Sequence, residues 1–381
     1  MDNSIKKRVI ILPGKYIQGP GVLAGIYDYI SILGKKPVFI WTKSARAVLS
    51  PVILPVLKKN NLDFFEVLFS GECTRQEAAR ISGEAAINGA DTVIGAGGGK
   101  VIDIAKAVAA YNNAPCMIIP TVPSSDASAS SYTVWYNEEG EFDGSNGWKF
   151  NPDIVIADTE ILVKAPKRFF IAGIGDALAT WYEAAAVHSS GKETPAGGTH
   201  TLTAVNSAKL CLDILFEYGK AAKESVEKKA VSAAFENVIE AVIFLSGIGW
   251  ENCGVATAHA IAMSIYSVFK GGHKFLHGEC VAFGLLCQLC LEKESKMDEL
   301  KRVIGFMAEM ELPLSFNDLG IKDVSFKKIK ELARETVLNQ ESVHNHNFKV
   351  TAKKLADAIF YANEIGLKRK NQQEILNKAQ G

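Results

Sequence analysis

Short apolar runs alternate with amphipathic stretches along the first 160 residues of the chain. The runs are rich in β-branched and aromatic side chains, and the stretches between them, such as CTRQEAARISGEAAINGA, have the period of a helix. The pattern predicts strands at residues 7–13, 36–42, 64–69, 91–97, 116–121, 131–137 and 153–159. Strands that alternate with helices indicate a parallel sheet with helices on its faces.

Beyond about residue 165 the strand-like runs disappear and longer apolar-periodic segments replace them. These segments predict helices at roughly 170–190, 196–218, 223–248, 251–269, 278–293, 296–310 and 351–365. The change follows NPDIVIADTEILVKAPKR, in which the last predicted strand leads into a proline-containing connection. We therefore predict an α/β domain over residues 1–162 and an all-helical domain over residues 163–381.

The composition narrows the class of partner. The 381 residues include 42 basic and 42 acidic side chains, and this balance argues against a nucleic-acid or membrane-surface binder. The start of the chain lacks an apolar signal core, and the uninterrupted apolar runs are shorter than the roughly 20 residues that span a bilayer. Seven scattered cysteines do not form a disulfide framework. We expect a cytoplasmic protein with reduced thiols that acts on a small molecule.

The segment DTVIGAGGGKVIDIAKA predicts a phosphate-binding turn between a strand and a helix. Gly98 and Gly99 allow close approach of the backbone, the helix start offers free N–H groups, and Lys100 adds a cation. The segment matches neither G-x-G-x-x-G nor a P-loop, and a strand-to-helix turn without a ligand is the alternative. Asp103 is expected in the first helical turn, either stabilising the helix dipole or bonding to a cofactor.

The next predicted strand ends in the loop PTVPSSDASASS, which is rich in hydroxyl groups and contains one acid, Asp126. Ligands of parallel sheets bind at the carboxyl ends of the strands, so this loop is a second candidate for the binding site. Ordinary turn chemistry explains the same composition and remains the alternative.

One aspartate and two histidines lie in apolar, helix-forming company. Asp176 stands in GIGDALATWYEA, His259 in ENCGVATAHAIAMS and His277 in GGHKFLHGECVAFG. Taken singly, Asp176 reads as a helix cap and each histidine as a hydrogen-bonded core residue. Taken together, they form an Asp/His/His set on three predicted helices, which suits a zinc or iron site with an open coordination position.

These motifs, in this order, resemble the iron-containing (group III) alcohol dehydrogenase superfamily, and in particular its glycerol dehydrogenase branch, over essentially the whole chain. The blocks that carry the resemblance are PGKYIQGPG, SGECTRQE, GAGGGKVIDIAKA, PTVPSSDASASSYTVWYNEEGEFD, NPDIVIADT, IAGIGDALATWYEA, FLSGIGWENCGVATAHA, HGECVAFG and ESVHN. The resemblance implies the dehydroquinate synthase-like fold, in which an α/β dinucleotide-binding domain precedes an all-helical domain.

The resemblance also implies ligands for this chain. Zn²⁺ would be bound by Asp176, His259 and His277, and Asp126 would touch the substrate, so that Asp126 and His277 are the expected catalytic residues. The iron enzymes of the superfamily carry a histidine one turn after the first aspartate. This chain has Thr180 at that place, as in the zinc-using branch. A nicotinamide dinucleotide would lie across Thr42, Gly98, Gly99, Lys100, Asp103, Thr121, Ser124, Ser130, Tyr132 and Tyr136.

One departure from the family pattern bears on the cofactor. The family usually has Gly-Asp-Lys after the second strand, whereas this chain has Trp41-Thr42-Lys43 and lacks the acid that rejects NADP. Lys43 and Arg46 would accommodate a 2′-phosphate, so NADP is possible beside NAD. The alternative is that the Trp–Thr pair only packs against adenine.

The expected activity is the zinc-dependent, NAD(P)-linked oxidation of a polyol, glycerol to dihydroxyacetone, by a homo-oligomer of two to eight chains. Three alternatives remain open on the same fold: NADPH-linked reduction of a 2-oxo acid, synthesis of an amino-cyclitol or sugar precursor, and a non-catalytic dinucleotide sensor. The altered strand end Trp41-Thr42-Lys43 favours NADPH-linked reduction of a 2-oxo acid, whereas the carboxylate of Asp126 would repel such a substrate. The complete Asp176, His259 and His277 set argues against the sensor.

Overall fold

A computed structural model describes residues 6–269 and 275–380, with the side chains of 293–295 and 370–380 left out. The chain forms two compact units that interleave in the sequence. The α/β unit comprises residues 10–173 and 217–248, and the helical unit comprises the other described residues. The fold class is as predicted, a parallel α/β sheet domain and a helical domain. The boundary between residues 162 and 163, which marks the change from strands to helices, stays a prediction.

The α/β unit contains a six-stranded sheet in the order β1-β8-β5-β4-β2-β3, and every pair is parallel. Its strands are β1 (Lys15–Gly19), β2 (Pro37–Trp41), β3 (Phe65–Leu68), β4 (Thr92–Gly97), β5 (Cys116–Pro120) and β8 (Ile154–Asp158). The four central strands are buried along their whole length, which explains their near-continuous apolar sequences.

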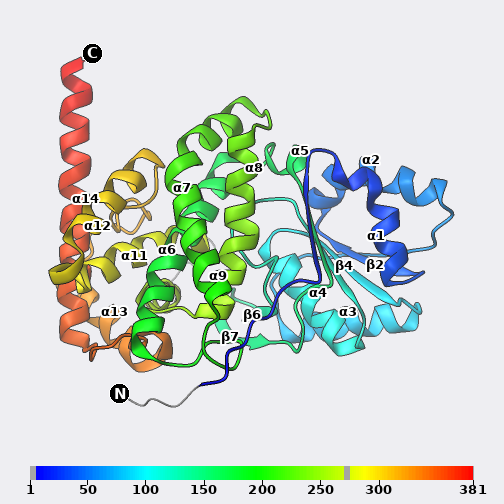
Figure 1. Cartoon of the computed structure of the whole chain (residues 1–381), viewed down its shortest axis with the longest axis horizontal. Helices are drawn as coiled ribbons and strands as arrows, with labels where there is room; N and C mark the ends of the chain where they lie inside the picture. The colour runs from blue at the N-terminus through cyan, green and yellow to red at the C-terminus, as the bar shows by residue number, and fades with distance from the viewer. Residues whose placement is uncertain (1–5, 270–274, 381) are drawn as a thin grey trace. The chain divides into compact units, whose positions relative to one another are not determined.

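Helices cover both faces of this sheet (Figure 1). On one face α1 (Ile26–Leu33) and α2 (Lys43–Lys59) join the core that includes Phe39, Trp41 and Ile94. On the other face α4 (Gly99–Asn112) lies directly on β4 and beside α3 (Arg75–Ile87). The short helix α5 (Thr159–Leu162) follows β8.

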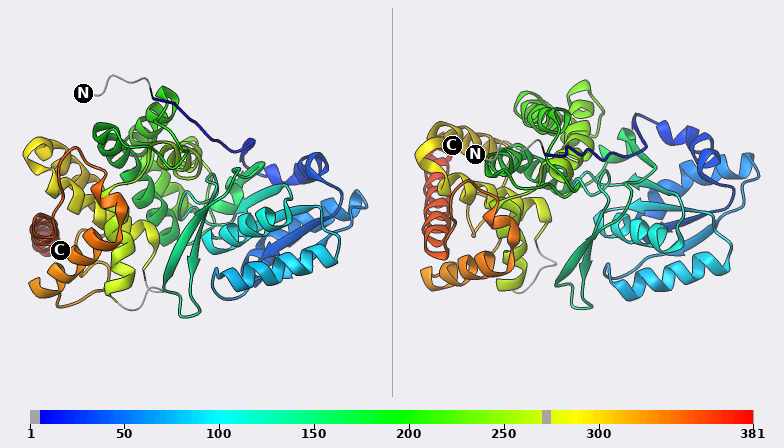
Figure 2. Two further views of the ribbon diagram at one scale, coloured as in Figure 1. Left: turned by 90° about the horizontal axis from the view of Figure 1, so that it is seen from below. Right: turned by 60° about the horizontal axis from the view of Figure 1, so that its bottom comes forward.

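One strand prediction was wrong, and one predicted strand forms but lies outside the parallel sheet. Residues 7–13 do not form a strand: Arg8 makes an isolated bridge with Thr199, Leu12 is 44% exposed, and the first strand is β1. β1 is an edge strand with the polar residues Lys15 and Gln18, so its alternation is weak. Residues 131–137 form β6 (Tyr132–Tyr136), which pairs outside the parallel sheet with the unpredicted strand β7 (Phe142–Gly147) in an antiparallel hairpin (Figure 2).

The helical segments differ from the prediction mainly in their ends. The helices are α6 (Lys167–Ser190), α7 (Leu202–Lys228), α8 (Ala233–Ile239), α9 (Ser246–Cys253), α10 (Thr257–Val268), α11 (His277–Leu291), α12 (Lys293–Glu309), α13 (Phe326–Asn339) and α14 (Ala352–Gln380). The predicted break at residues 219–222 is wrong, because α7 continues to Lys228 and ends where Lys229 adopts a left-handed conformation. Helix α13 was not predicted.

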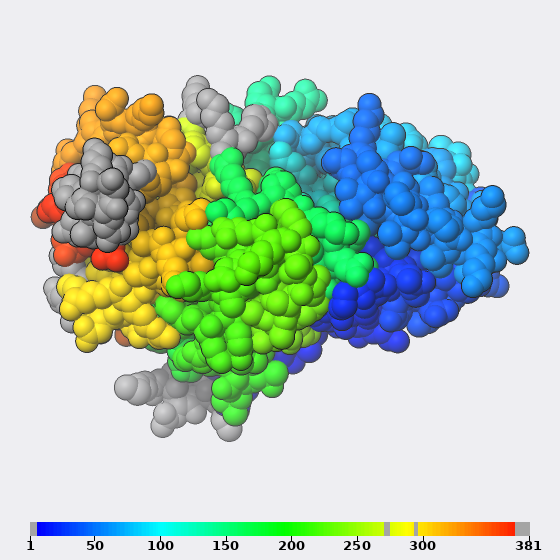
Figure 3. All heavy atoms as spheres, turned by 90° about the horizontal axis from the view of Figure 1, so that it is seen from above, coloured from blue at the N-terminus to red at the C-terminus, as the bar shows by residue number. Residues whose placement is uncertain are grey.

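Helix α7 is amphipathic. Its buried positions include Ala204, Ala208, Leu215 and Val226, spaced by multiples of three to four residues, and its residues, in green, form part of the face shown in Figure 3. The charged residues on its outer face make this a surface helix of the fold.

The run Ala233–Cys253 joins α8 and α9 through a π-helical segment, Glu240–Leu245. Among the described residues it is the one helix with the length and composition of a membrane span. In its most apolar part 61% of the residues are buried inside the structure. Core helices of globular proteins commonly combine this length and burial, so the helix is weak evidence for a membrane.

Candidate active site

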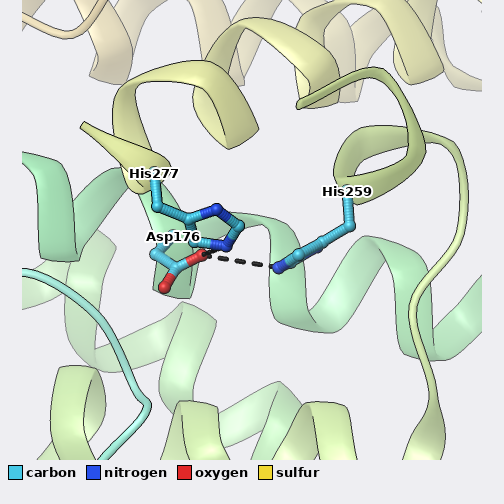
Figure 4. Close-up of side chains that lie close together, drawn as sticks. All are labelled: Asp176, His259 and His277. Atoms are coloured by element: carbon cyan, nitrogen blue, oxygen red, sulfur yellow. Dashed lines mark ion pairs between the residues drawn. The ribbon is translucent and has the colours of Figure 1, made fainter. Parts of the chain in front are cut away.

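The structure brings Asp176, His259 and His277 together (Figure 4). They come from α6, α10 and α11 of the helical unit. Oδ1 of Asp176 lies 3.5 Å from Nε2 of His259 and 3.4 Å from Nε2 of His277, and one donor atom from each residue lies within 4.8 Å of the others. Within the described parts of the chain, this is the one cluster of three or more histidine, cysteine and acidic side chains with such spacing.

Close packing of the three helices positions these side chains. A Cβ atom on Gly175 would lie 2.5 Å from the carbonyl oxygen of Gly278, and one on Gly284 would lie 2.2 Å from that of Ala258. Only glycine therefore lets α6 approach the start of α11, and α11 approach α10, at these distances. Gly175 directly precedes Asp176 in the chain. Gly284 packs against Ala258, which directly precedes His259.

The cluster fits a divalent metal ion. Three ligands at about 2.0–2.1 Å in tetrahedral arrangement lie about 3.3 Å from one another, close to the two Asp176–histidine distances. Asp176 is only 1% exposed, and a buried carboxylate is costly unless positive charge compensates it. Helix α6 begins at Lys167, so Asp176 lies in its interior and the helix-cap alternative is wrong. Thr180, one turn further on, is buried and offers no imidazole.

Glu183 holds His259 in place, and the sequence analysis missed it. Its Oε2 is in close contact with Nδ1 of His259, and its Oε1 accepts hydrogen bonds from the backbone N–H groups of Ala256 at 2.7 Å and His259 at 3.0 Å. Burial acts to lower the pKa of His259, but Glu183 and Asp176 outweigh it and hold that pKa well above its usual range. The only signal in the sequence is the spacing, two helical turns after Asp176.

The predicted phosphate turn lies where β4 meets α4 in the α/β unit. Gly98 is the N-cap of α4, and the sheet order reverses between β4 and β2, which is where open α/β sheets bind ligands. A Cβ atom on Gly98 or Gly99 would meet no protein atom closer than 3.4 Å. Packing within the protein does not demand these two glycines, so they fit a backbone that is approached by a phosphate.

Two charged residues of this turn contact protein groups. The Lys100 ammonium lies 2.7 Å from Oε1 of Glu72 and 5.3 Å from the Tyr136 ring centre. Helix α4 begins at Gly99, so Asp103 lies one turn deeper than predicted. There it is paired with the buried Lys106 at 2.8 Å and accepts a hydrogen bond from the Val134 N–H at 3.0 Å. Asp103 thus fastens β6 to α4, and its contact with a cofactor stays a prediction.

The hydroxyl-rich loop after β5 begins beside the phosphate turn. The N–H of Thr121 donates to the carbonyl oxygen of Gly97 at 3.0 Å, which ties the loop to the end of β4. Ser124 and Tyr132 are half-buried, while Ser130 is buried and donates within the loop to the Ala127 carbonyl at 3.5 Å. Thr42, the phosphate turn and this loop thus follow the neighbouring strands β2, β4 and β5, whereas Tyr132 and Tyr136 lie on β6 outside this sheet.

Asp126 is buried in the same loop, and Oδ2 of Asp126 accepts a hydrogen bond of 2.6 Å from the Ser246 hydroxyl. Ser246 begins α9 directly after the π-helical segment, a feature frequent at functional sites. The sequence analysis did not single out Ser246, because 120 residues separate it from its partner.

Thr42 caps α2, since its hydroxyl accepts a hydrogen bond from the Ala45 N–H at 3.1 Å. Arg46 forms an ion pair of 3.1 Å with Glu66. A cavity of about 470 Å³ lies at the carboxyl ends of β2 and β3, lined by Thr42, Lys43, Ser44, Leu68, Phe69 and Ser70. Of the two cations expected near a 2′-phosphate, only Lys43 lines this cavity.

Comparison with known proteins places the whole chain among relatives of known class. Residues 13–159 match the family described as "Iron-containing alcohol dehydrogenase". The glycerol dehydrogenase of Pseudomonas putida is 39% identical over 94% of this chain and 98% of its own, and that of Thermotoga maritima is 39% identical over 95% and 98%. The crystal structure of glycerol dehydrogenase from Schizosaccharomyces pombe superposes with a TM-score of 0.92 at 34% identity, covering 97% of this chain and 94% of that one.

Proposed function

The chain belongs to the iron-containing alcohol dehydrogenase family, and on this premise we propose that it is a zinc-dependent, NAD(P)-linked polyol dehydrogenase that oxidises glycerol to dihydroxyacetone. Membership makes it an oxidoreductase. The observation that carries the proposal is the convergence of Asp176, His259 and His277. These three side chains would supply three ligands, and a catalytic site of this kind keeps its fourth position for water or substrate. We further expect a cytoplasmic protein that forms a homo-oligomer, and light scattering of the purified protein would test the oligomer.

In this proposal the metal cluster and the phosphate turn have different tasks. Asp176, His259 and His277 would hold the ion, which when bound supplies a Lewis acid for the alcohol oxygen. The N–H groups of Gly98 and Gly99 would bind the cofactor diphosphate, and the nicotinamide accepts the hydride that leaves the alcohol carbon. The proton of the alcohol leaves to solvent, so that an alcohol becomes a ketone. His277 counts as catalytic because it would border the reacting oxygen.

Asp126 would select the substrate. The hydroxyl of Ser246 occupies one side of its carboxylate, at Oδ2. A second hydroxyl of a polyol would be a further donor to this carboxylate, because a carboxylate accepts several hydrogen bonds. A 2-oxo acid would instead bring a second negative charge toward Asp126.

Purified protein assayed with glycerol, 1,2-propanediol and 2-oxobutanoate, each with both cofactors, tests the proposal. We expect oxidation of glycerol to be faster than reduction of 2-oxobutanoate. The reverse order would indicate a hydroxycarboxylate dehydrogenase. Cofactor binding without turnover of any of the three substrates would indicate a sensor.

The cofactor preference gives a prediction at Thr42. Because no acid repels a 2′-phosphate there, we expect NADP to be used within about tenfold of NAD, a difference of roughly 1.4 kcal/mol. Aspartate is also a good N-cap, so Thr42→Asp should preserve the start of α2 while lowering kcat/KM for NADP at least about tenfold. Thr42→Asn, which caps without charge, is the matched control and should leave the ratio of the two cofactors nearly unchanged. Strict NAD specificity of the unmodified enzyme would contradict this prediction.

A further inference from the structure

Glu183 is fully buried in the helical unit, and the reaction described above gives it no role. It lies seven residues after Asp176 on α6, so both carboxylates project from the same side of the helix. Figure 4 shows the ring of His259 directed toward Asp176. The ring thus lies between two carboxylates, with Nδ1 against Glu183 and Nε2 facing Asp176 at 3.5 Å.

The hydrogen bonds of Glu183 decide which ring nitrogen of His259 carries the proton. An ionised carboxylate only accepts hydrogen bonds, so Nδ1 must be the N–H donor. Nε2 then keeps its lone pair whenever the ring is neutral. The opposite tautomer would place the lone pair of Nδ1 against the carboxylate and block Nε2 with a proton.

We propose that Glu183 is a positioning residue of the metal site, which fixes the tautomer and the orientation of His259 so that Nε2 is presented to the ion. The inference rests on the proposed function, because it takes Asp176, His259 and His277 as the ligands. Carboxylates that orient a metal-binding histidine in this way commonly change metal affinity 10- to 100-fold when they are replaced.

Besides its contact with the ring of His259, Glu183 also caps the start of α10. The test must separate these two roles. Helix α10 has no side-chain cap of its own at Ala256, and Glu183 Oε1 accepts the N–H groups of Ala256 and His259. Gln288 Oε1 accepts a third, from Ala258, at 3.1 Å. These side-chain oxygens take the place of the missing cap at the start of α10. Loss of Glu183 would therefore also loosen the start of α10.

Glutamine separates the two tasks. In Glu183→Gln the amide oxygen still accepts the backbone N–H groups of α10, while the amide NH₂ now faces Nδ1 of His259 and can only donate to it. This bond places the ring proton on Nε2, the atom that should bind the ion. Glu183→Ala removes both tasks. Glu292→Gln is the matched control, because the Glu292 side chain is 7% exposed and its Oε1 lies 3.4 Å from Nδ1 of His346, a histidine outside the cluster.

The experiment measures the dissociation constant for Zn²⁺, by competition with a chromophoric chelator, and the thermal unfolding midpoint of the metal-free protein. We expect Glu183→Gln to bind Zn²⁺ about 10- to 100-fold more weakly than the unmodified chain, with little change in the metal-free midpoint. Glu183→Ala should lower both the affinity and the midpoint, and Glu292→Gln should keep the affinity within twofold. The visible absorption of the Co²⁺-loaded protein should also change in Glu183→Gln, because a different set of atoms binds the ion.

A Zn²⁺ affinity of Glu183→Gln within twofold of the unmodified chain would overturn the inference and reduce Glu183 to a cap of α10. That result would leave the proposed function standing. If the unmodified chain itself takes up neither zinc nor iron, the metal site fails, and both the proposed function and the role of Glu183 are overturned.

Discussion

Purified His259→Ala and His277→Ala variants should contain almost no metal and should not oxidise glycerol. Each change removes one of three protein ligands, and because replacing an orienting neighbour alone costs 10- to 100-fold, loss of a ligand should lower metal affinity by more than about 100-fold. The unmodified protein should carry about one zinc per chain, as expected for a single three-ligand site. Elemental analysis after dialysis measures the metal content, and the initial rate of NADH formation measures glycerol oxidation.

His188→Ala is the matched control for these variants. His188 lies on α6, as Asp176 does, but it is exposed and pairs with His200. Its replacement should leave the metal content and the rate unchanged. The assignment of the metal site is wrong if His259→Ala and His277→Ala both retain full metal content and turnover.

Asp126→Asn should lower kcat/KM for glycerol by about 10- to 100-fold, because a charge-assisted hydrogen bond contributes about 1.5–3 kcal/mol. The side chain stays isosteric and can still accept the bond from Ser246. Cofactor affinity should remain nearly unchanged, and reduction of 2-oxobutanoate should improve because a repulsive charge is removed. In the unmodified enzyme kcat/KM for glycerol should exceed kcat/KM for 1-propanol by a wide margin, since the simple alcohol lacks the second hydroxyl that would donate to the carboxylate.

Asp143→Asn provides the control for charge. Asp143 belongs to the same unit, is exposed on β7 and pairs with Arg75, so its replacement should not affect glycerol oxidation. Equal kcat/KM for glycerol in Asp126→Asn and the unmodified enzyme, combined with faster reduction of 2-oxobutanoate than oxidation of glycerol, would contradict the polyol assignment.

The sequence predicted all four strands that the fold buries along their whole length, and also the partly buried strands β3 and β6. β2, β4, β5 and β8 lie inside the sheet, and their almost continuous apolar runs follow from that burial. The edge strand β1 and the hairpin strand β7, with the sequence FDGSNG, have solvent on one side and no such pattern. Their pairing depends on partners that are distant in the chain or reversed in direction, and periodicity does not report on those.

The sequence predicted those residues of the candidate site whose side-chain type alone indicates a chemical role. Asp176, His259 and His277 are donor types that bind metal ions, and an apolar setting made each one conspicuous. Glu183 and Ser246 are common residues in helices, and a solvent-facing position is the ordinary expectation for them. Their functions depend on contacts with the start of α10 and with Asp126, which only the folded chain brings into reach.

Metal-dependent turnover tests the central claim most directly. The protein is stripped with a chelator, titrated with Zn²⁺, and assayed at each step for oxidation of glycerol with NAD and NADP. We predict that the stripped protein is inactive and that the rate rises with added zinc until about one ion per chain is bound, as for a single site with three protein ligands. Glycerol oxidation at the full rate by protein shown to be free of metal would contradict the account.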